Sequence, residues 1–108
     1  MLEINSLIRR DCVNNQSMKQ PIYKVVGYQP ATPSKRKSKW KKENPAYYKL
    51  EALTPRLSLN NNDDWTHSGL SDEILIVGRD ENNYVAVSDA EFAEINQIFR
   101  ASTRRNRW

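Results

Sequence analysis

The sequence of 108 residues holds one cysteine and one histidine, and these low counts exclude two kinds of site. Cys12 has no second cysteine with which to form an internal disulfide, which favours a reducing, cytoplasmic setting. A tetrahedral zinc site needs about four nitrogen or sulfur ligands, and Cys12 and His67 are the only candidates. No flanking motif marks these two residues as a nucleophile and its base.

The chain also has only three glycines, and none of them lies in a phosphate-binding loop or in a turn that exposes a catalytic serine. Carboxylates that could offer oxygen ligands to Mg²⁺ or Ca²⁺ lie in or beside one polar loop: Asp63, Asp64, Asp72 and Glu73. Their spacing matches no calcium loop, and turn formation accounts for residues 60–64. We therefore expect no metal site, no cofactor and no enzymatic activity.

No apolar stretch approaches the roughly eighteen residues of a membrane-spanning helix, and residues 1–10 lack the apolar core of a secretion signal. We expect no contact with a membrane. The apolar fraction is 38%, below the roughly 45–50% of average domains, which indicates one core with loops and tails. The expected division is an N-terminal segment and linker at 1–20, a single domain at 21–102 with a basic loop at 34–45, and a basic tail at 103–108.

The net charge of +4 conceals a strong polarity along the chain. Residues 1–56 carry a formal charge of +8, residues 57–99 carry −8, and residues 100–108 add four arginines. Either the fold keeps the two halves apart and creates fields of both signs, or the halves neutralise each other. The sequence leaves both outcomes open.

Several patterns in the first two thirds of the chain predict elements. Within residues 1–13, helical spacing predicts a short amphipathic helix with one apolar face: Ile4, Leu7, Ile8 and Cys12. Residues 21–29 and 46–53 are rich in β-branched and aromatic side chains and predict strands, and residues 56–59 continue the second strand after a kink. Residues 34–45 and 60–71 are polar and predict loops.

The C-terminal third predicts a hairpin followed by a helix. Two apolar runs, residues 74–77 and 84–87, flank a polar turn that begins at Gly78. Ser88 and Glu91 have the spacing of a capping box, which marks a helix start. One face of that helix is apolar and holds Phe92, Ile95, Ile98 and Phe99.

Both predicted hairpin strands are apolar on both faces, and one helix covers only one face. The other face needs the N-terminal segment, other strands of a curled sheet, or a second copy of the chain in a homodimer. Together the patterns predict an α+β fold. It is a small, curled antiparallel sheet of four to five strands with the C-terminal helix packed on it, preceded by the short N-terminal helix.

Six cations surround one tryptophan between the first two predicted strands: Lys35, Arg36, Lys37, Lys39, Trp40, Lys41 and Lys42. Cations release counterions from phosphates, and an indole stacks on an unpaired base. A second basic cluster beside Trp108 contains Arg104, Arg105 and Arg107. The same lysine-rich run also fits a solvated linker, a targeting signal or a patch for an acidic protein.

The favoured hypothesis is a non-enzymatic accessory protein that binds nucleic acid, with DNA and RNA not distinguished, through the basic loop and the arginine-rich tail. In this hypothesis Trp40 stacks on a base. The alternative is a regulator or inhibitor that docks on a nucleic-acid enzyme through the acidic residues 57–99 or an apolar sheet face. Such an inhibitor would suit a virus or a mobile element. Composition does not separate the two hypotheses.

Overall fold

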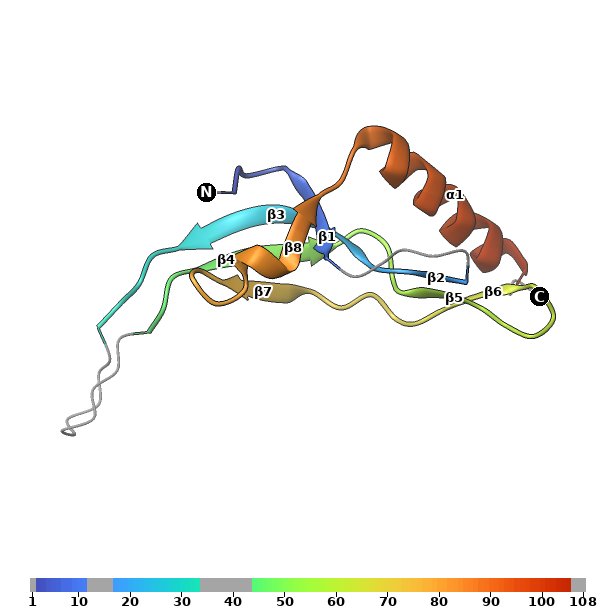
Figure 1. Cartoon of the computed structure of the whole chain (residues 1–108), viewed down its shortest axis with the longest axis horizontal. Helices are drawn as coiled ribbons and strands as arrows, with labels where there is room; N and C mark the ends of the chain where they lie inside the picture. The colour runs from blue at the N-terminus through green and yellow to red at the C-terminus, as the bar shows by residue number, and fades with distance from the viewer. Residues whose placement is uncertain (1, 12–16, 34–43, 106–108) are drawn as a thin grey trace.

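The computed structural model describes residues 2–11, 17–33 and 44–105, and beyond Ser102 it describes the backbone alone. The larger of two antiparallel sheets contains β1 (Leu7–Arg10), β3 (Ile22–Gln29), β4 (Tyr47–Ala52), β7 (Glu73–Ile76) and β8 (Tyr84–Ala86). The smaller contains β2 (Met18–Lys19), β5 (Leu57–Leu59) and β6 (Trp65–His67). One helix, α1 (Asp89–Arg105), ends the described chain (Figure 1). The α+β class and the helix are confirmed, whereas the second sheet was not predicted.

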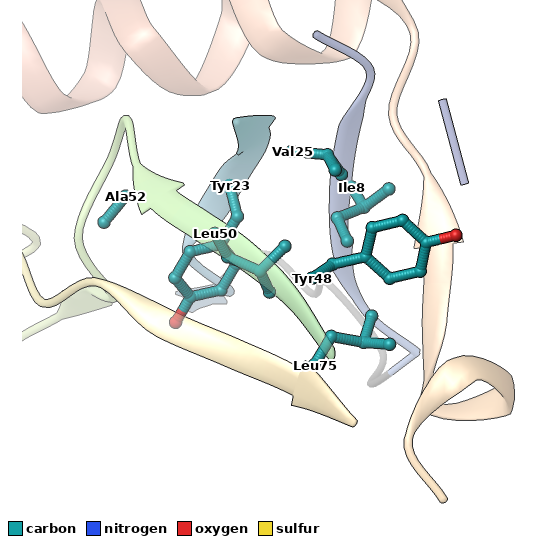
Figure 2. Packing of buried hydrophobic residues seen from close by; sticks show 7 residues of the cluster. All are labelled: Ile8, Tyr23, Val25, Tyr48, Leu50, Ala52 and Leu75. Atoms are coloured by element: carbon teal, nitrogen blue, oxygen red, sulfur yellow. The ribbon is translucent and has the colours of Figure 1, made fainter. Parts of the chain in front are cut away.

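Strand β3 separates two hydrophobic cores because successive side chains of a strand point to opposite faces. Tyr23 and Val25 point into the hollow of the curled sheet, where they join side chains from the neighbouring strands (Figure 2): Ile8, Tyr48, Leu50, Ala52 and Leu75. Ile22 points the other way and is buried with Leu57, Val87 and Ile95 beneath α1. The curling of the sheet therefore covers one face of its strands, and α1 covers part of the other.

The predicted N-terminal helix is wrong, because residues 7–10 form strand β1 between β3 and β8. Leu7 and Ile8 serve different cores: Leu7 packs beneath α1, while Ile8 is buried inside the curled sheet. Adjacent apolar residues on opposite faces suit a central strand, and a short isolated helix nucleates poorly. Asn5, with a φ of 74°, turns the chain just before the strand.

The predicted hairpin is also wrong, although both of its strands exist. The sheet order is β7-β4-β3-β1-β8, so the two strands lie at opposite edges of the sheet. Gly78, with a φ of 82°, and a 3₁₀ turn (Glu81–Asn83) lead the chain away from β7. Strand β8 then pairs with β1 in the register Ile8↔Ala86. Apolar pattern and turn residues indicate a strand, but they do not name its partner.

The chain after β4 crosses from the large sheet to the small one. Residues 57–59 do form a strand, as expected, but β5 pairs with β2 and β6 instead of extending β4. The expected loop at 60–71 contains β6, so that prediction is wrong at residues 65–67. Within the turn, Asn60 Oδ1 accepts hydrogen bonds from the backbone N–H groups of Asn62 at 2.9 Å and Asp64 at 3.0 Å.

The start of α1 follows the sequence prediction. The Ser88 hydroxyl accepts a hydrogen bond from the Glu91 backbone N–H at 3.2 Å, which satisfies one of the unpaired donors of the first turn. The Glu91 carboxylate accepts a hydrogen bond from Arg9 Nε at 2.7 Å, and this ion pair ties α1 to β1. Asp89 and Glu91 also favour the positive end of the helix dipole.

The crossing between the two sheets depends on Thr54, which is fully buried. Its hydroxyl accepts a hydrogen bond from the Ile22 backbone N–H at 3.0 Å. In return, the Ile22 carbonyl accepts hydrogen bonds from the N–H groups of Leu53 at 2.8 Å and Thr54 at 3.4 Å. Pro55 then prevents the chain from continuing along β4. This joint holds the end of β4 against the start of β3.

We predict that Ser88→Ala lowers the free energy of unfolding by about 1 kcal/mol, because it removes the cap acceptor for the Glu91 N–H. Urea denaturation monitored by circular dichroism measures this change. The matched variant Ser88→Thr keeps a hydroxyl and should lose less. Equal loss in both variants would show that the cap does not stabilise the helix.

We predict that Thr54→Val lowers the free energy of unfolding by about 1–3 kcal/mol, because the buried Ile22 N–H loses its acceptor while side-chain volume is kept. Thr54→Ser retains the acceptor and leaves only a methyl-sized gap, so it should cost about 1 kcal/mol. Denaturant titration of both variants compares these effects. A Thr54→Val protein as stable as the parent would exclude this joint as a stabilising contact.

Candidate functional site

Most of the basic residues singled out in the sequence lie outside the residues that the structure describes. This holds for Trp40, for Arg107 and for the six cations of the lysine-rich run: Lys35, Arg36, Lys37, Lys39, Lys41 and Lys42. Arg104 and Arg105 lie in the last turn of α1, where only the backbone is described. The structure thus leaves this predicted site untested, and what it adds is the geometry of the residues that flank the lysine-rich run.

The ladder between β3 and β4 continues past the ends of both strands. Thr32 and Asn44 form an isolated antiparallel bridge. In it, the Thr32 N–H donates to the Asn44 carbonyl at 3.0 Å and the Asn44 N–H donates back at 2.8 Å. The described chain is therefore a paired, two-stranded ribbon on both sides of residues 33–43. We call this ribbon, residues 28–32 and 44–48, the arm.

The arm is attached to the body through aromatic residues. Tyr28 and Tyr48 lie opposite each other, with ring centroids 5.0 Å apart. Tyr48 is buried in the core inside the curled sheet, while Tyr28 is 47% exposed. Nearer the body, a β-bulge interrupts the ladder between Val25 and Gly27. A bulge bends a strand and increases its twist, which sets the direction in which the arm leaves the sheet.

The described body and the remaining segments carry opposite charge. Residues with described side chains (2–11, 17–33 and 44–102) contain eight Lys or Arg and twelve Asp or Glu, a formal charge of −4. The rest of the chain contains nine Lys or Arg and one Glu, a formal charge of +8. The polarity in the sequence therefore does not divide the fold into a basic half and an acidic half. It separates an acidic body from the two basic clusters.

The arm and the end of α1 lie at opposite ends of the molecule (Figure 1). The molecule is elongated, with extents of 56 × 26 × 23 Å. The chain enters residues 34–43 at one end of the long axis and leaves α1 at the other. The described residues that flank the two basic clusters therefore lie at separate places on the body.

A polar cleft of about 440 Å³ lies where the two edges of the curled sheet approach each other. One side is formed by Glu73 and Ile74 of β7, and the other by the end of β1 and the start of β8. The turn between β7 and β8 closes one end. The remaining lining residues are Arg10, Asp11, Arg79, Asp80, Asn82, Asn83 and Tyr84. The sequence did not indicate this cleft, because its residues meet only once β1 is known to pair with β8.

Tyr84 lines the cleft and Tyr23 packs against the Tyr84 ring, and the pKa values of both side chains are raised. Burial raises the pKa of Tyr23 above its ordinary value of 10.0, and the Glu73 carboxylate and Tyr84 raise it further. Burial also raises the pKa of Tyr84, against the opposing effect of Arg10. The two rings meet edge to face with centroids 6.5 Å apart. Glu73 therefore projects its charge toward a pair of neutral phenols.

Asp80 fixes the turn at the end of β7. Its carboxylate pairs with Arg79, with Nε 3.0 Å from Oδ1, and it also accepts the Ile76 N–H at 2.9 Å. The Arg79 hydrogen bond and then the Ile76 N–H lower the pKa of Asp80. Arg79 and Asp80 thereby largely neutralise each other within the cleft lining.

Asp72 and His67, which were weighed as metal or catalytic groups, have structural partners. Asp72 accepts the Ala52 N–H at 3.1 Å. His67 Nδ1 lies 3.1 Å from Ser102 Oγ, whose hydroxyl donates to the Phe99 carbonyl at 2.8 Å. Ser102 thus bonds both to His67 and to the backbone of α1. Across the described side chains, no three His, Cys, Asp or Glu residues form a group that could hold a metal ion.

No family model, curated protein or solved structure matches the chain. Within the described part of the chain, no helix is both long and apolar enough to cross a membrane. The candidate sites are therefore the arm, defined by its ladder, and the polar cleft, defined by its lining residues.

We predict that Glu73→Gln lowers the pKa of Tyr23 and Tyr84, because it removes a negative charge that opposes phenolate formation. Raised folded-state pKa values give stability that is present below pH 10.0 and lost as the pH rises through them. The loss of unfolding free energy above that pH should therefore be smaller in Glu73→Gln. Ultraviolet titration, assigned with Tyr23→Phe and Tyr84→Phe, measures the pKa change.

Glu51→Gln is the matched control, because Glu51 is exposed on the opposite face of β4. It should leave both tyrosine titrations unchanged. Identical titrations in the parent and Glu73→Gln would contradict the placement of Glu73 beside the phenols.

Proposed function

We propose that the chain is a nucleic-acid-binding protein that engages phosphates through the lysine-rich residues between the two sides of the arm in the sequence. The observation that carries the proposal is the Thr32–Asn44 bridge. The chain is paired directly before and after residues 33–43, so the run Lys35 to Lys42 lies in the sequence between the two sides of this ribbon. A two-stranded β-ribbon is one of the elements that fit a nucleic-acid groove.

The acidic body supports the same function by limiting the binding surface. The described side chains sum to −4, so phosphates are repelled by the body and attracted to the basic clusters. Neutralised phosphates release counterions, which supplies most of the affinity of non-specific binding. A charge arrangement of this kind favours contact through the arm over contact through the sheets.

The Arg-rich end of α1 adds a separate contact in this proposal. It leaves the body at the end opposite to the arm (Figure 1), so its arginines engage phosphates distant from those at the arm. Trp40, placed among the cations, supplies a stacking surface for an unpaired base.

The proposal is tested by the salt dependence of binding. We predict that changing Lys39 and Lys41 to Gln reduces the slope of log affinity against log salt by about 1.4 to 1.8, since each phosphate contact contributes about 0.7 to 0.9. Fluorescence anisotropy with single- and double-stranded DNA and RNA measures the slope. Changing Lys24 and Lys49 to Gln, both on strands of the body, removes the same charge and should leave the slope nearly unchanged.

Trp40→Ala separates stacking from charge in the same assay. It should weaken binding to single strands by about 1–3 kcal/mol, leave the salt slope unchanged and affect duplexes less. Equal slope changes in the arm pair and the body pair would refute the proposal. So would affinity weaker than about 10⁻⁴ M at physiological salt, the weak limit of ordinary non-specific binding.

A further inference from the structure

The two edge strands of the large sheet run parallel to each other. Each neighbouring pair in the order β7-β4-β3-β1-β8 is antiparallel, so after four reversals β8 has the direction of β7. Parallel neighbours need a crossover connection of about a dozen or more residues. Only residues 77–83 join β7 to β8. The curled sheet therefore cannot close by pairing its own edges, although they approach each other at the cleft.

Both edges present backbone groups that the ladders leave unused. In an antiparallel ladder, every second residue bonds to the neighbouring strand. The Val77 N–H donates to the Ala46 carbonyl. Ile74 is therefore at a non-bonded position and directs its N–H and C=O away from β4. On the other edge, the Asp11 N–H donates to the Asn83 carbonyl and the Val87 N–H donates to the Leu7 carbonyl. These bonds show which residues of β8 bond to β1 and which lie between the bonded positions. Tyr84 and Ala86 therefore direct their N–H and C=O groups away from β1. We call these groups of Ile74, Tyr84 and Ala86 the seam.

On the β7 edge, the outward backbone groups of Ile76 have hydrogen-bond partners, whereas those of Ile74 have none within the part of the chain that the structure describes. The N–H and C=O of Ile76 also point away from β4. The Asp80 carboxylate accepts the Ile76 N–H, and the Ile76 carbonyl accepts the N–H groups of Arg79 and Asp80. Capping of this kind is a usual means of blocking an edge. Ile74 has no such cap among the described residues, and its side chain is 51% exposed.

The cleft beside the seam is acidic. Asp11 and Glu73 outnumber Arg10, because Arg79 and Asp80 pair with each other. Glu73 is half-buried on the inner face, and no described residue forms a hydrogen bond or an ion pair with its carboxylate. An occupant with a cationic side chain would provide the missing partner.

We propose that the seam binds an extended, Lys- or Arg-bearing segment of a partner protein as a sixth strand. One strand antiparallel to β7 is also antiparallel to β8, so a single segment can bond to both edges. The main chain of the segment would supply hydrogen bonds to Ile74, Tyr84 and Ala86, and a cationic side chain would meet Glu73. This inference does not rest on the proposed nucleic-acid binding.

Hydrogen exchange measured by nuclear magnetic resonance tests the seam in the full chain. The probe is a blocked hexapeptide of alternating threonine and lysine, with threonine–glutamate and threonine–serine peptides for comparison. We expect the amides of Ile74, Tyr84 and Ala86 to exchange rapidly in the free protein and to become protected with the lysine peptide. The glutamate peptide should protect them least. No protection by the lysine peptide, or equal protection by all three peptides, would overturn the proposal.

Ile74→Pro removes the outward N–H without removing a bond of the β4–β7 ladder, since proline is tolerated at such edge positions. It should weaken binding of the lysine peptide about three- to tenfold, the loss expected for one hydrogen bond. Ile74→Thr removes the same side chain but keeps the N–H, and it should bind like the parent. Because Ile74→Pro can also disturb the fold, Ala86→Pro repeats the test on the other edge. Equal binding by both proline variants and the parent would refute strand addition.

Glu73→Gln should weaken the lysine peptide about two- to fivefold, as for a partly exposed charge pair, and leave the serine peptide unchanged. Two further outcomes would contradict the partner assigned here. Protection of the Ile74 amide in the free protein at every concentration would show that another part of the same chain fills the seam. Protection that grows with protein concentration would show that a second copy fills it.

Discussion

The contact between Ile22 and Thr54 is the constraint on which the rest of the structure depends. At Ile22 the backbone bonds to Thr54 and Leu53, while the side chain enters the core beneath α1 and the next residue, Tyr23, enters the other core. The two cores therefore share strand β3, and β1 serves both as well through Leu7 and Ile8. The chain leaves the large sheet directly after this contact and enters the smaller sheet at β5.

In this arrangement the described body forms the two cores, and many of the cations lie outside it. The two cores hold the most deeply buried apolar residues of the described chain, whereas the exposed large apolar residues include Ile4, Val26, Tyr28, Leu70 and Ile74. Nine of the seventeen Lys and Arg residues lie outside the residues whose side chains the structure describes. In the proposed function, substitutions in the lysine-rich run change electrostatic binding. Substitutions near Thr54 affect folding first.

Local signals predicted the elements well and their partners poorly. The strands at 22–29 and 47–52 and the helix that Ser88 caps follow from composition, turn residues and capping chemistry, all of which act within a few residues. The pairing of β8 with β1 joins residues about as far apart as the chain allows within the described fold, and nothing local encodes it. The helix predicted at 1–13 failed for a related reason. An apolar spacing that suits one helical face also suits a strand buried on both faces, and only the neighbours of β1 decide between them. The cleft was missed because it exists only through that pairing.

The arm has a length that the cores do not determine. Its last buried contact is Tyr48, and beyond it the ladder runs through Thr32 and Asn44 without touching either core. Adding two residues to each side would extend its reach by about 7 Å and keep every side chain on its original face, whereas adding one to each side would turn the tip over. The length of the arm thus sets how far its end lies from the body. Related chains could vary the distance between body and tip in discrete steps while the fold stays the same.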